Sequence, residues 1–211
     1  MNYHLHTPIA ISLSEFFPNS PEAVRAMIEA GAEIIHVRKT YASEEELFTW
    51  LEQVDPVFYP HLTLHHHPKL VRRCKLGGIH FRYNEFDKNF DKSGEIFRRS
   101  ASCHNWAEVK SLTGYADYVF LSPIFDSLSK TGYSSAFTEE QLKILLNDPD
   151  RPQVVALGGI TVDNIRKIRQ WGFEGAAAVG SVWAMKDGRK VDIQQTVKNY
   201  LELNKAWNET E

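Results

Sequence analysis

The stretch QVVALGGITVDNIRKIRQWGFEGAAAVGSVW, residues 153–183, carries the strongest signal of fold class in the chain. Two apolar runs, 154–157 and 175–179, each end in a glycine-containing turn, and one amphipathic helical segment lies between them. Apolar runs without alternation are typical of strands that are covered on both faces. We therefore expect two adjacent parallel strands, with the turns Gly158-Gly159 and Gly180-Ser181 side by side at their carboxyl ends.

The two glycine turns predict a phosphate site. Glycine has no side chain to cover main-chain N–H groups, and several N–H dipoles that converge on an anion bind it without burying a lysine. The candidate phosphate-binding residues are Gly158, Gly159, Val179 and Gly180. An alternative interpretation is that these glycines only let a helix pack closely on the strands.

Outside this stretch, the chain alternates strand-like and helical segments. The strand-like runs are 3–11, 33–38, 62–66, 78–81, 100–104, 118–125, 154–157 and 175–179. Helical patterns cover 20–30, 43–54, 68–74, 106–112, 138–146, 161–171 and 192–207. Such alternation with right-handed crossovers predicts a parallel sheet, and eight units close it into a single (β/α)8 TIM barrel over residues 1–211. The alternative is an open doubly wound sheet, which the count of units disfavours. Segment 82–99 fits least well, as a polar loop with a short helix around 95–98.

Composition limits the classes of function. The chain has 211 residues, 43% of them hydrophobic, and a formal net charge of -3. The lack of a clustered basic face argues against nucleic acid as a partner, and no apolar run approaches the ~20 residues that span a bilayer. We expect a cytoplasmic protein whose Cys74 and Cys103 are free thiols. Whether the chain forms homo-oligomers is left open.

Histidines form a second pattern, because all of them lie in the first half of the chain. They are His4, His6, His36, His61, His65, His66, His67, His80 and His104. Nearly all fall within or at the end of a predicted strand, and the carboxyl ends of the strands form the active face of this barrel. Several imidazoles should therefore meet in one mouth, although any single one could fill a polar core position. Strand alternation would send His65 and His67 to one side and His66 to the other.

A third group follows the sixth predicted strand, in the sequence YVFLSPIFDSLSKTGY at 118–133. Ser127, Ser129 and Lys130 bring two hydroxyls and one ammonium into one loop, and such groups can bind the oxygens of a diphosphate or a carboxylate. The alternative is an ordinary serine-rich loop with a solvated lysine.

Taken together, the motifs resemble those of the thiamine phosphate synthases. SPIFDSLSKTG at 122–132 resembles the GPIFxTxTK segment of that family, and SASCH at 100–104 resembles its SxH strand. ALGGIT at 156–161 and AAAVGSVW at 176–183 are similar to its terminal phosphate motifs. The resemblance extends from EIIHVRK at 33–39 onward, and the thiazole tautomerases of the same family share this plan.

The resemblance implies a (β/α)8 barrel that joins an aminopyrimidine methyl diphosphate to a thiazole phosphate and releases pyrophosphate. Loss of diphosphate would leave a pyrimidine carbocation that the thiazole nitrogen captures, so catalysis would depend on stabilising the charge of the leaving group. Arg38 and Lys130 would bind the diphosphate, and Ser102 would contact the pyrimidine or the leaving group. The thiazole phosphate would be held by Ser127, Ser129, Gly159 and the Val179-Gly180 backbone.

The chain departs from the family pattern on the second to fourth strands. His65-His66-His67 stands where the family has Asn-Asp-Arg, so His66 replaces one carboxylate that binds magnesium. Glu85 corresponds to the second metal carboxylate, and His36 replaces a glutamine. Because Mg²⁺ prefers oxygen ligands, the magnesium implied by the resemblance would keep one protein carboxylate, Glu85.

These departures leave three functions open. In an atypical synthase, Glu85 and the diphosphate would retain one magnesium while Arg38, Lys130 and a protonated histidine neutralise the remaining charge. In a tautomerase, a histidine would move a proton on the thiazole ring. The tautomerase histidine of the sixth-strand motif is Pro123 here, so His104 or His65 would have to replace it. The third function is a phosphate-ligand binder without turnover. The retained Lys130 favours the synthase.

Overall fold

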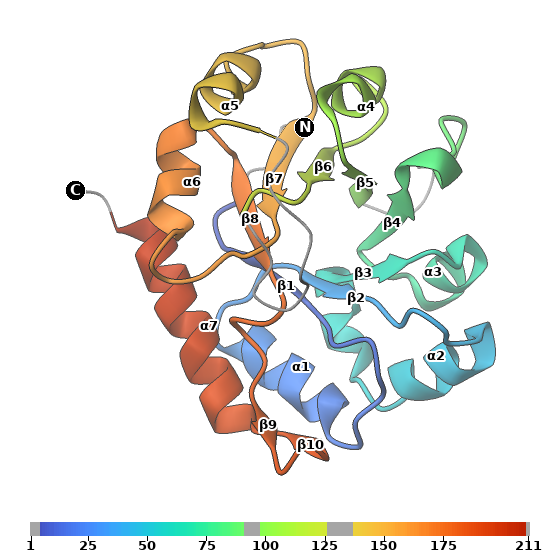
Figure 1. Ribbon diagram of the computed structural model, residues 1–211. Helices are drawn as coiled ribbons and strands as arrows, with labels where there is room; N and C mark the ends of the chain where they lie inside the picture. Colours follow the sequence, from blue (N-terminus) through green and yellow to red (C-terminus); the bar gives the residue numbers. More distant parts are fainter. Residues whose placement is uncertain (1–4, 91–97, 126–136, 210–211) are drawn as a thin grey trace.

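The structure, a computed structural model, describes residues 5–90, 98–125 and 137–209. Eight parallel strands follow one another around a closed barrel, in which β8 pairs back to β1. Figure 1 looks into this barrel, with the helices arranged as a ring around the strands. The predicted (β/α)8 barrel is confirmed.

Most strands and helices lie close to the predicted ranges, but residues 5–8 of the first predicted strand and 161–164 of the sixth predicted helix lie outside those elements. The barrel strands are β1 (Ile9–Ile11), β2 (Ile35–Val37), β3 (Leu62–His65), β4 (Gly78–Arg82), β5 (Arg98–Cys103), β6 (Tyr118–Leu121), β7 (Gln153–Leu157) and β8 (Gly175–Ala178). The helices are α1 (Ser20–Glu29), α2 (Glu44–Leu51), α3 (Pro68–Cys74), α4 (Trp106–Ser111), α5 (Glu139–Leu146), α6 (Ile165–Trp171) and α7 (Ile193–Asn208). The sixth strand ends before Pro123, whose missing N–H cannot join the ladder.

Three short elements were not predicted. The 3-10 turns η1 (Pro56–His61) and η2 (Tyr83–Glu85) flank β3 and β4, and the hairpin β9 (Met185–Lys186) and β10 (Lys190–Val191) precedes α7. Each element is short, so its sequence carries too few residues for a recognisable period.

Side-chain caps fix where two of the helices begin. Ser43 accepts a hydrogen bond from the Glu46 N–H at 3.2 Å, and the Glu46 carboxylate accepts one from the Ser43 N–H at 2.8 Å. Thr138 and Gln141 form the same reciprocal pair before α5. These capping boxes satisfy N–H groups that have no partner within the helix, and they explain why both helices start where predicted.

The interior of the barrel has an apolar side and a polar side. The apolar side chains come mainly from β1, β6, β7 and β8 and include Ile9, Ile11, Phe120, Val155 and Ala177. The buried polar residues inside the barrel come from β2 to β5 and are His36, Thr63, His80, Arg98 and Ser100. Arg99 points to the helix side of β5, where its guanidinium donates to the Phe90 carbonyl. The polar side therefore faces the half of the barrel in which the histidine-rich strands lie.

Cys74 and Cys103 are both free thiols, as predicted. Among the helices of the described residues, none combines the length and the apolar character that crossing a membrane requires. Cytoplasmic location stays a prediction from the sequence, and the oligomeric state stays open.

Candidate functional site

The two glycine turns lie next to each other at the carboxyl end of the barrel. Leu157 at the end of β7 pairs in parallel register with Ala177 of β8, so the residues that follow emerge side by side. Gly158 and Gly159 have φ angles of 103° and 63°. Side chains rarely tolerate these values, so the turn requires glycine. The predicted juxtaposition of the two turns is confirmed.

Hydrogen bonds orient the peptide groups of the first turn. The Gly158 carbonyl accepts from the Phe125 N–H at 3.2 Å, and the Gly159 carbonyl accepts from Asn164 Nδ2 at 2.8 Å. In a trans peptide the C=O and the N–H that share one plane point in opposite directions. The N–H groups of Gly159 and Ile160 therefore point away from these neighbours.

The second turn is closed by two hydrogen bonds to one carbonyl oxygen. The Val179 carbonyl accepts from the N–H groups of Val182 and Trp183 at 3.1 and 3.2 Å. The first N–H groups of such a turn have no partner within it. Gly180 is exposed, and a Cβ built on it would meet no atom of the described residues within 4 Å. Ser181 Oγ is buried and has no hydrogen-bond partner in the described part of the chain.

Together the turns offer a set of unsatisfied donors to one region. Over residues 5–90, 98–125 and 137–209, no hydrogen bond occupies the N–H groups of Gly159, Gly180 and Ser181. Gly159 and Ser181 are half-buried, and half-buried donors without partners are rare, whereas the exposed Gly180 N–H is open to a ligand. An anion would satisfy all three donors. This arrangement can bind a phosphate monoester.

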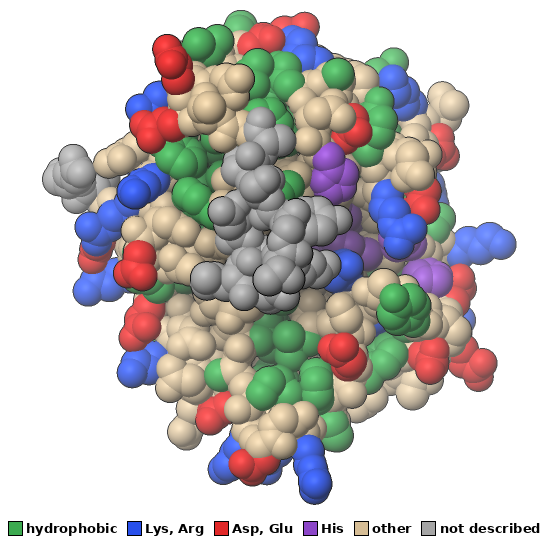
Figure 2. Space-filling model, viewed as in Figure 1, with side chains coloured by type: hydrophobic (Ala, Val, Ile, Leu, Met, Phe, Trp, Pro, Cys, Tyr) green, Lys and Arg blue, Asp and Glu red, His purple; other side chains and the backbone are tan. Residues whose placement is uncertain are grey.

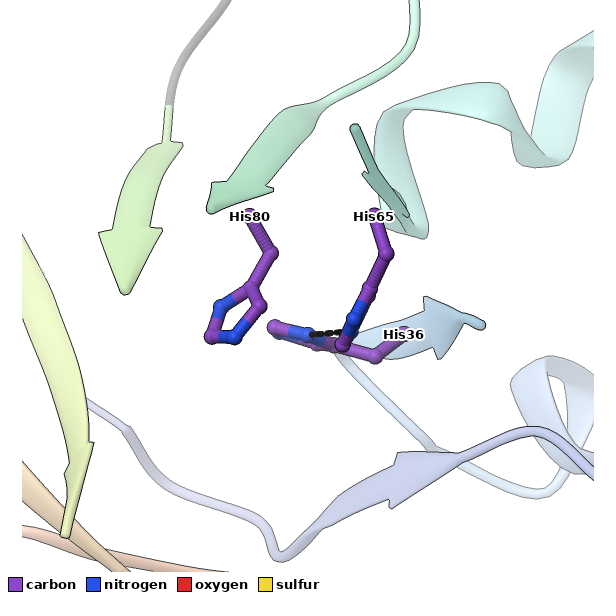
Figure 3. A group of neighbouring side chains, drawn as sticks. All are labelled: His36, His65 and His80. Atoms are coloured by element: carbon purple, nitrogen blue, oxygen red, sulfur yellow. Dashed lines mark hydrogen bonds between the residues drawn. The ribbon is translucent and has the colours of Figure 1, made fainter. Parts of the chain in front are cut away.

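Three imidazoles meet inside the polar side of the barrel, one each from β2, β3 and β4 (Figure 3). His36 Nδ1 and His65 Nε2 share a hydrogen bond of 3.0 Å. His65 lies directly opposite His80 in the parallel register, and their ring centroids are 4.3 Å apart. The prediction that several imidazoles meet is confirmed for this His cluster, defined as His36, His65 and His80.

Hydroxyl groups surround the His cluster. The Tyr118 hydroxyl lies 2.6 Å from His36 Nε2. His80 is held from both sides, with Nδ1 2.8 Å from Ser100 Oγ and Nε2 2.8 Å from Ser102 Oγ. Ser102, a predicted catalytic residue, is half-buried. Its hydrogen bond to His80 links it to the cluster.

The His cluster is neutral at physiological pH. Burial lowers the pKa of His36 and of His65 well below the usual value of 6.5, and their neighbours His80 and His36 lower them further. Burial also lowers the pKa of His80 to about 3. Removing a cation from water is costly, and the described surroundings of these rings hold no carboxylate to repay the cost.

This burial predicts that the protein loses stability as the pH falls from 7 to 5. An unfolded histidine binds a proton below pH about 6.5, whereas His80 in the folded state stays neutral down to pH about 3. Each such residue costs about 1.4 kcal/mol of unfolding free energy per pH unit within that window. Urea unfolding at both pH values, with a chelator present, measures the slope. Equal stability at pH 7 and pH 5 would contradict the prediction. In His36→Gln, the unfolding free energy should change less with pH, because one buried histidine is removed.

Arg38 and His104 lie at the rim of the mouth. Arg38 follows β2 with its side chain exposed, its N–H donates to Ser12 Oγ at 2.9 Å, and its guanidinium donates to Ser14 Oγ at 3.3 Å. His104 follows β5, and its Nδ1 donates to the Ser122 carbonyl at 3.0 Å, which leaves Nε2 as an acceptor. Figure 2 shows histidine side chains reaching this face together with Lys and Arg side chains.

Lys39 serves a different part of the molecule. Its ammonium is buried and donates to the carbonyls of Leu13 and Glu15 at 2.9 and 2.7 Å. It also lies 5.1 Å from the ring centroid of Phe16. Burial lowers the pKa of Lys39 to about 8. This lysine fixes the loop after β1, and its polar contacts are already occupied.

The alternation predicted for the three consecutive histidines is wrong. The strand β3 ends at His65, and His66 and His67 both adopt left-handed conformations with φ of 62° and 53°. Extended-strand alternation therefore does not apply to them. His66 Nδ1 contacts a Glu85 carboxylate oxygen at 3.0 Å, and Arg82 contacts the other at 3.4 Å. Partial burial lowers the pKa of His66, and this effect outweighs the attraction of Glu85.

The side chains around Glu85 do not fit a protein-held magnesium ion. Mg²⁺ requires an octahedron of oxygen ligands, and Glu85 has a histidine and an arginine beside it. Within the described residues, the one convergent group of three or more His, Cys, Asp or Glu side chains is the all-nitrogen His cluster. We derive no catalytic step through magnesium.

Part of the predicted site lies outside the described residues. These positions are Ser127, Ser129 and Lys130. Residues 95–97 of the short helix expected at 95–98 also lie outside the described residues, and Arg98, expected in that helix, begins β5 instead. His80 and Ser181 belong to the observed site, although neither was singled out as a candidate site residue. His80 occurs in an apolar strand pattern that gives no sign of which rings it meets, and the isolation of Ser181 Oγ depends on packing that the sequence does not reveal.

Comparisons with known proteins converge on one family. A family model described as thiamine monophosphate synthase matches residues 10–182. A thiamine-phosphate synthase from Psychrobacter sp. (strain PRwf-1) is 26% identical over 179 residues, which cover 80% of this chain and 83% of that protein. A thiamine-phosphate synthase from Bacteroides fragilis (strain YCH46) is 27% identical over 176 residues, or 79% of this chain and 86% of that protein.

Two of the similar solved structures are named thiamine phosphate pyrophosphorylases. A crystal structure of thiamine phosphate pyrophosphorylase from Bacteroides thetaiotaomicron superposes with a TM-score of 0.81 at 27% identity, and covers 95% of this chain and 96% of that one. A thiamine phosphate pyrophosphorylase from Pyrococcus furiosus has a TM-score of 0.74 at 17% identity, with 97% and 98% covered, and shares the fold.

Proposed function

The chain belongs to the thiamine monophosphate synthase family, and on that premise we propose that it is a transferase that makes thiamine phosphate. It joins an aminopyrimidine methyl diphosphate to a thiazole phosphate. The bond between the pyrimidine methylene carbon and the diphosphate oxygen breaks, the thiazole nitrogen bonds to that carbon, and pyrophosphate leaves. Both substrates are small phosphate compounds.

The observation that carries this proposal is the pair of open turns after β7 and β8. The N–H groups of Gly159, Gly180 and Ser181 have no partner in the described chain, and they suit the phosphate of the thiazole substrate. Phosphate bound there would anchor the thiazole ring over the barrel, because the turns are rigidly tied to the strands. Positioning of this kind removes much of the entropic barrier to a reaction between two substrates.

The diphosphate is assigned to the opposite half of the mouth. Arg38, at the end of β2, presents an exposed guanidinium that can pair with phosphate oxygens. Ser102, held by His80, presents a hydroxyl to the pyrimidine or to the leaving group. The roles of Lys130 at the diphosphate and of Ser127 and Ser129 at the thiazole phosphate rest on the family resemblance alone. Cationic groups at the leaving diphosphate stabilise the charge that develops as the bond breaks.

The proposal predicts that the purified protein forms thiamine phosphate from the two substrates when magnesium is supplied over a range of concentrations. Lys130→Ala should lower the rate by about 100-fold, because it removes a cation from the leaving group. Lys186→Ala is the matched control, since it removes one positive charge from the exposed hairpin strand β9. Chromatography measures the thiamine phosphate formed by the wild type and by each variant. No product from the wild type at any metal concentration would remove the synthase assignment.

A further inference from the structure

We propose that the His cluster is a binding site for one transition-metal ion of the Zn²⁺ class. One ring nitrogen from each of His36, His65 and His80 lies within 4.8 Å of the other two. Three imidazoles on neighbouring strands, with the fourth position left open, form a ligand set typical of zinc and related ions. The inference goes beyond the proposed transfer reaction and does not depend on it.

The geometry is close to what coordination requires. Ligand nitrogens about 2.0–2.1 Å from a tetrahedral ion lie about 3.3 Å from one another. His36 Nδ1 and His65 Nε2, which come from adjacent strands, are already 3.0 Å apart. Figure 3 shows His36 and His65 in contact and His80 beside them, with all three rings turned toward a common space. Small side-chain rotations of His80 would bring its nitrogen to the same distance.

The hydroxyl groups around the rings are placed as outer partners of metal ligands. Such ligands usually donate their second N–H to a neighbouring oxygen, which fixes the tautomer. The Tyr118 hydroxyl lies beside His36 Nε2, and Ser100 Oγ lies beside His80 Nδ1. These contacts leave His36 Nδ1 and His80 Nε2 for the ion. Ser102 Oγ, now 2.8 Å from His80 Nε2, would give up that hydrogen bond when the metal binds.

The protonation state and the access route also suit a metal. The three rings are neutral because of their burial, and neutral imidazole is the form that binds metal ions. His65 and Ser102 are half-buried rather than fully buried, so solvent reaches the cluster. Nitrogen ligands exclude magnesium as the preferred ion, because Mg²⁺ takes oxygen ligands.

The first test is titration of the chelator-treated protein with Zn²⁺ alone, in the absence of substrates, by calorimetry. We expect saturable binding of one ion per chain that millimolar Mg²⁺ does not displace. His36→Gln and His65→Asn each remove one ligand but keep a polar amide in a similar space. Each should weaken binding by more than about 100-fold, since even outer partners contribute roughly 10–100-fold.

His61→Gln is the control for non-specific binding. His61 precedes β3 and has its Nδ1 3.0 Å from the Glu33 carbonyl, outside the His cluster, so its loss should leave Zn²⁺ affinity unchanged. Glu85→Gln should also leave Zn²⁺ affinity unchanged. Unchanged affinity in both His36→Gln and His65→Asn would overturn the site, as would the absence of saturable binding to the wild-type protein.

A measurement on the wild-type protein covers the case in which a variant does not fold. X-ray absorption of the Zn²⁺-loaded chain should show three imidazole ligands at about 2.0–2.1 Å, with multiple-scattering features of the rings. A first shell of oxygen atoms would refute the site. Both metal measurements are made without substrates, so their failure would leave the transfer assignment standing.

Discussion

Gly180→Asp is expected to lower thiamine phosphate formation by about 1,000-fold. The substitution places a carboxylate where the thiazole phosphate is proposed to bind, and like charges about 4 Å apart at an effective dielectric constant near 20 repel by about 4 kcal/mol. That energy corresponds to the expected loss of rate. The assay is product formation at saturating pyrimidine diphosphate, together with calorimetric affinity for thiazole phosphate.

A matched variant at Gly180 separates the effect of charge from the effect of side-chain size. Among the described residues, a Cβ at Gly180 meets no atom within 4 Å, and the φ of Gly180 is outside the left-handed region, so the backbone there accepts a residue with a Cβ. Gly180→Asn has nearly the same size without the charge and should lose far less activity than Gly180→Asp. Equal losses in the two variants would show that bulk rather than charge matters, and unaltered activity in Gly180→Asp would place the phosphate elsewhere.

The largest effect on stability is expected for Gly77→Ala. A Cβ at Gly77 would overlap the Pro60 carbonyl oxygen and the Arg98 guanidinium. Both are held in place, since Arg98 Nη2 donates to Pro60 O at 2.6 Å and the Gly77 N–H donates to Tyr59 O at 2.9 Å. Because backbone must move, we expect a loss of roughly 3–5 kcal/mol.

For a chain of this size, such a loss lowers the midpoint of thermal unfolding by about 10 °C. Gly180→Ala is the matched control, because the same methyl group would touch none of the residues that the structure describes and should change stability by less than about 0.5 kcal/mol. Scanning calorimetry compares the two variants with the wild type. A Gly77→Ala midpoint within a degree or two of the Gly180→Ala midpoint would contradict the close packing of Gly77 against Pro60 and Arg98.

Much of the fold could be predicted because its signals are local. The continuous apolar runs mark the buried parallel strands, and the caps at Ser43 and Thr138 mark helix starts that depend on neighbouring residues alone. The adjacency of the two glycine turns followed from the order of the strands. The end of β3 did not, because the left-handed conformations of His66 and His67 depend on contacts made later in the chain.

The phosphate-binding part of the candidate site could be predicted because its signals are also local, and the membership of the His cluster could not. The turns at Gly159 and Gly180 have a sequence signature, whereas the His cluster exists because β2, β3 and β4 align in one register. His80 stands in an apolar strand and meets His65 only through that register. Lys39 follows Arg38, a predicted diphosphate residue, in the sequence but does not lie at the site with it. Its ammonium donates to carbonyls of the loop after β1, a contact that the sequence does not reveal.

The most direct measurement is a crystal structure with thiazole phosphate bound. The phosphate oxygens should lie about 2.7–3.2 Å from the main-chain nitrogens of Gly159 and Gly180, the range of N–H···O hydrogen bonds. Ser181 Oγ should gain a phosphate oxygen as its partner. A phosphate bound elsewhere in the molecule, with these N–H groups facing only water, would contradict the phosphate site and the reaction proposed on it.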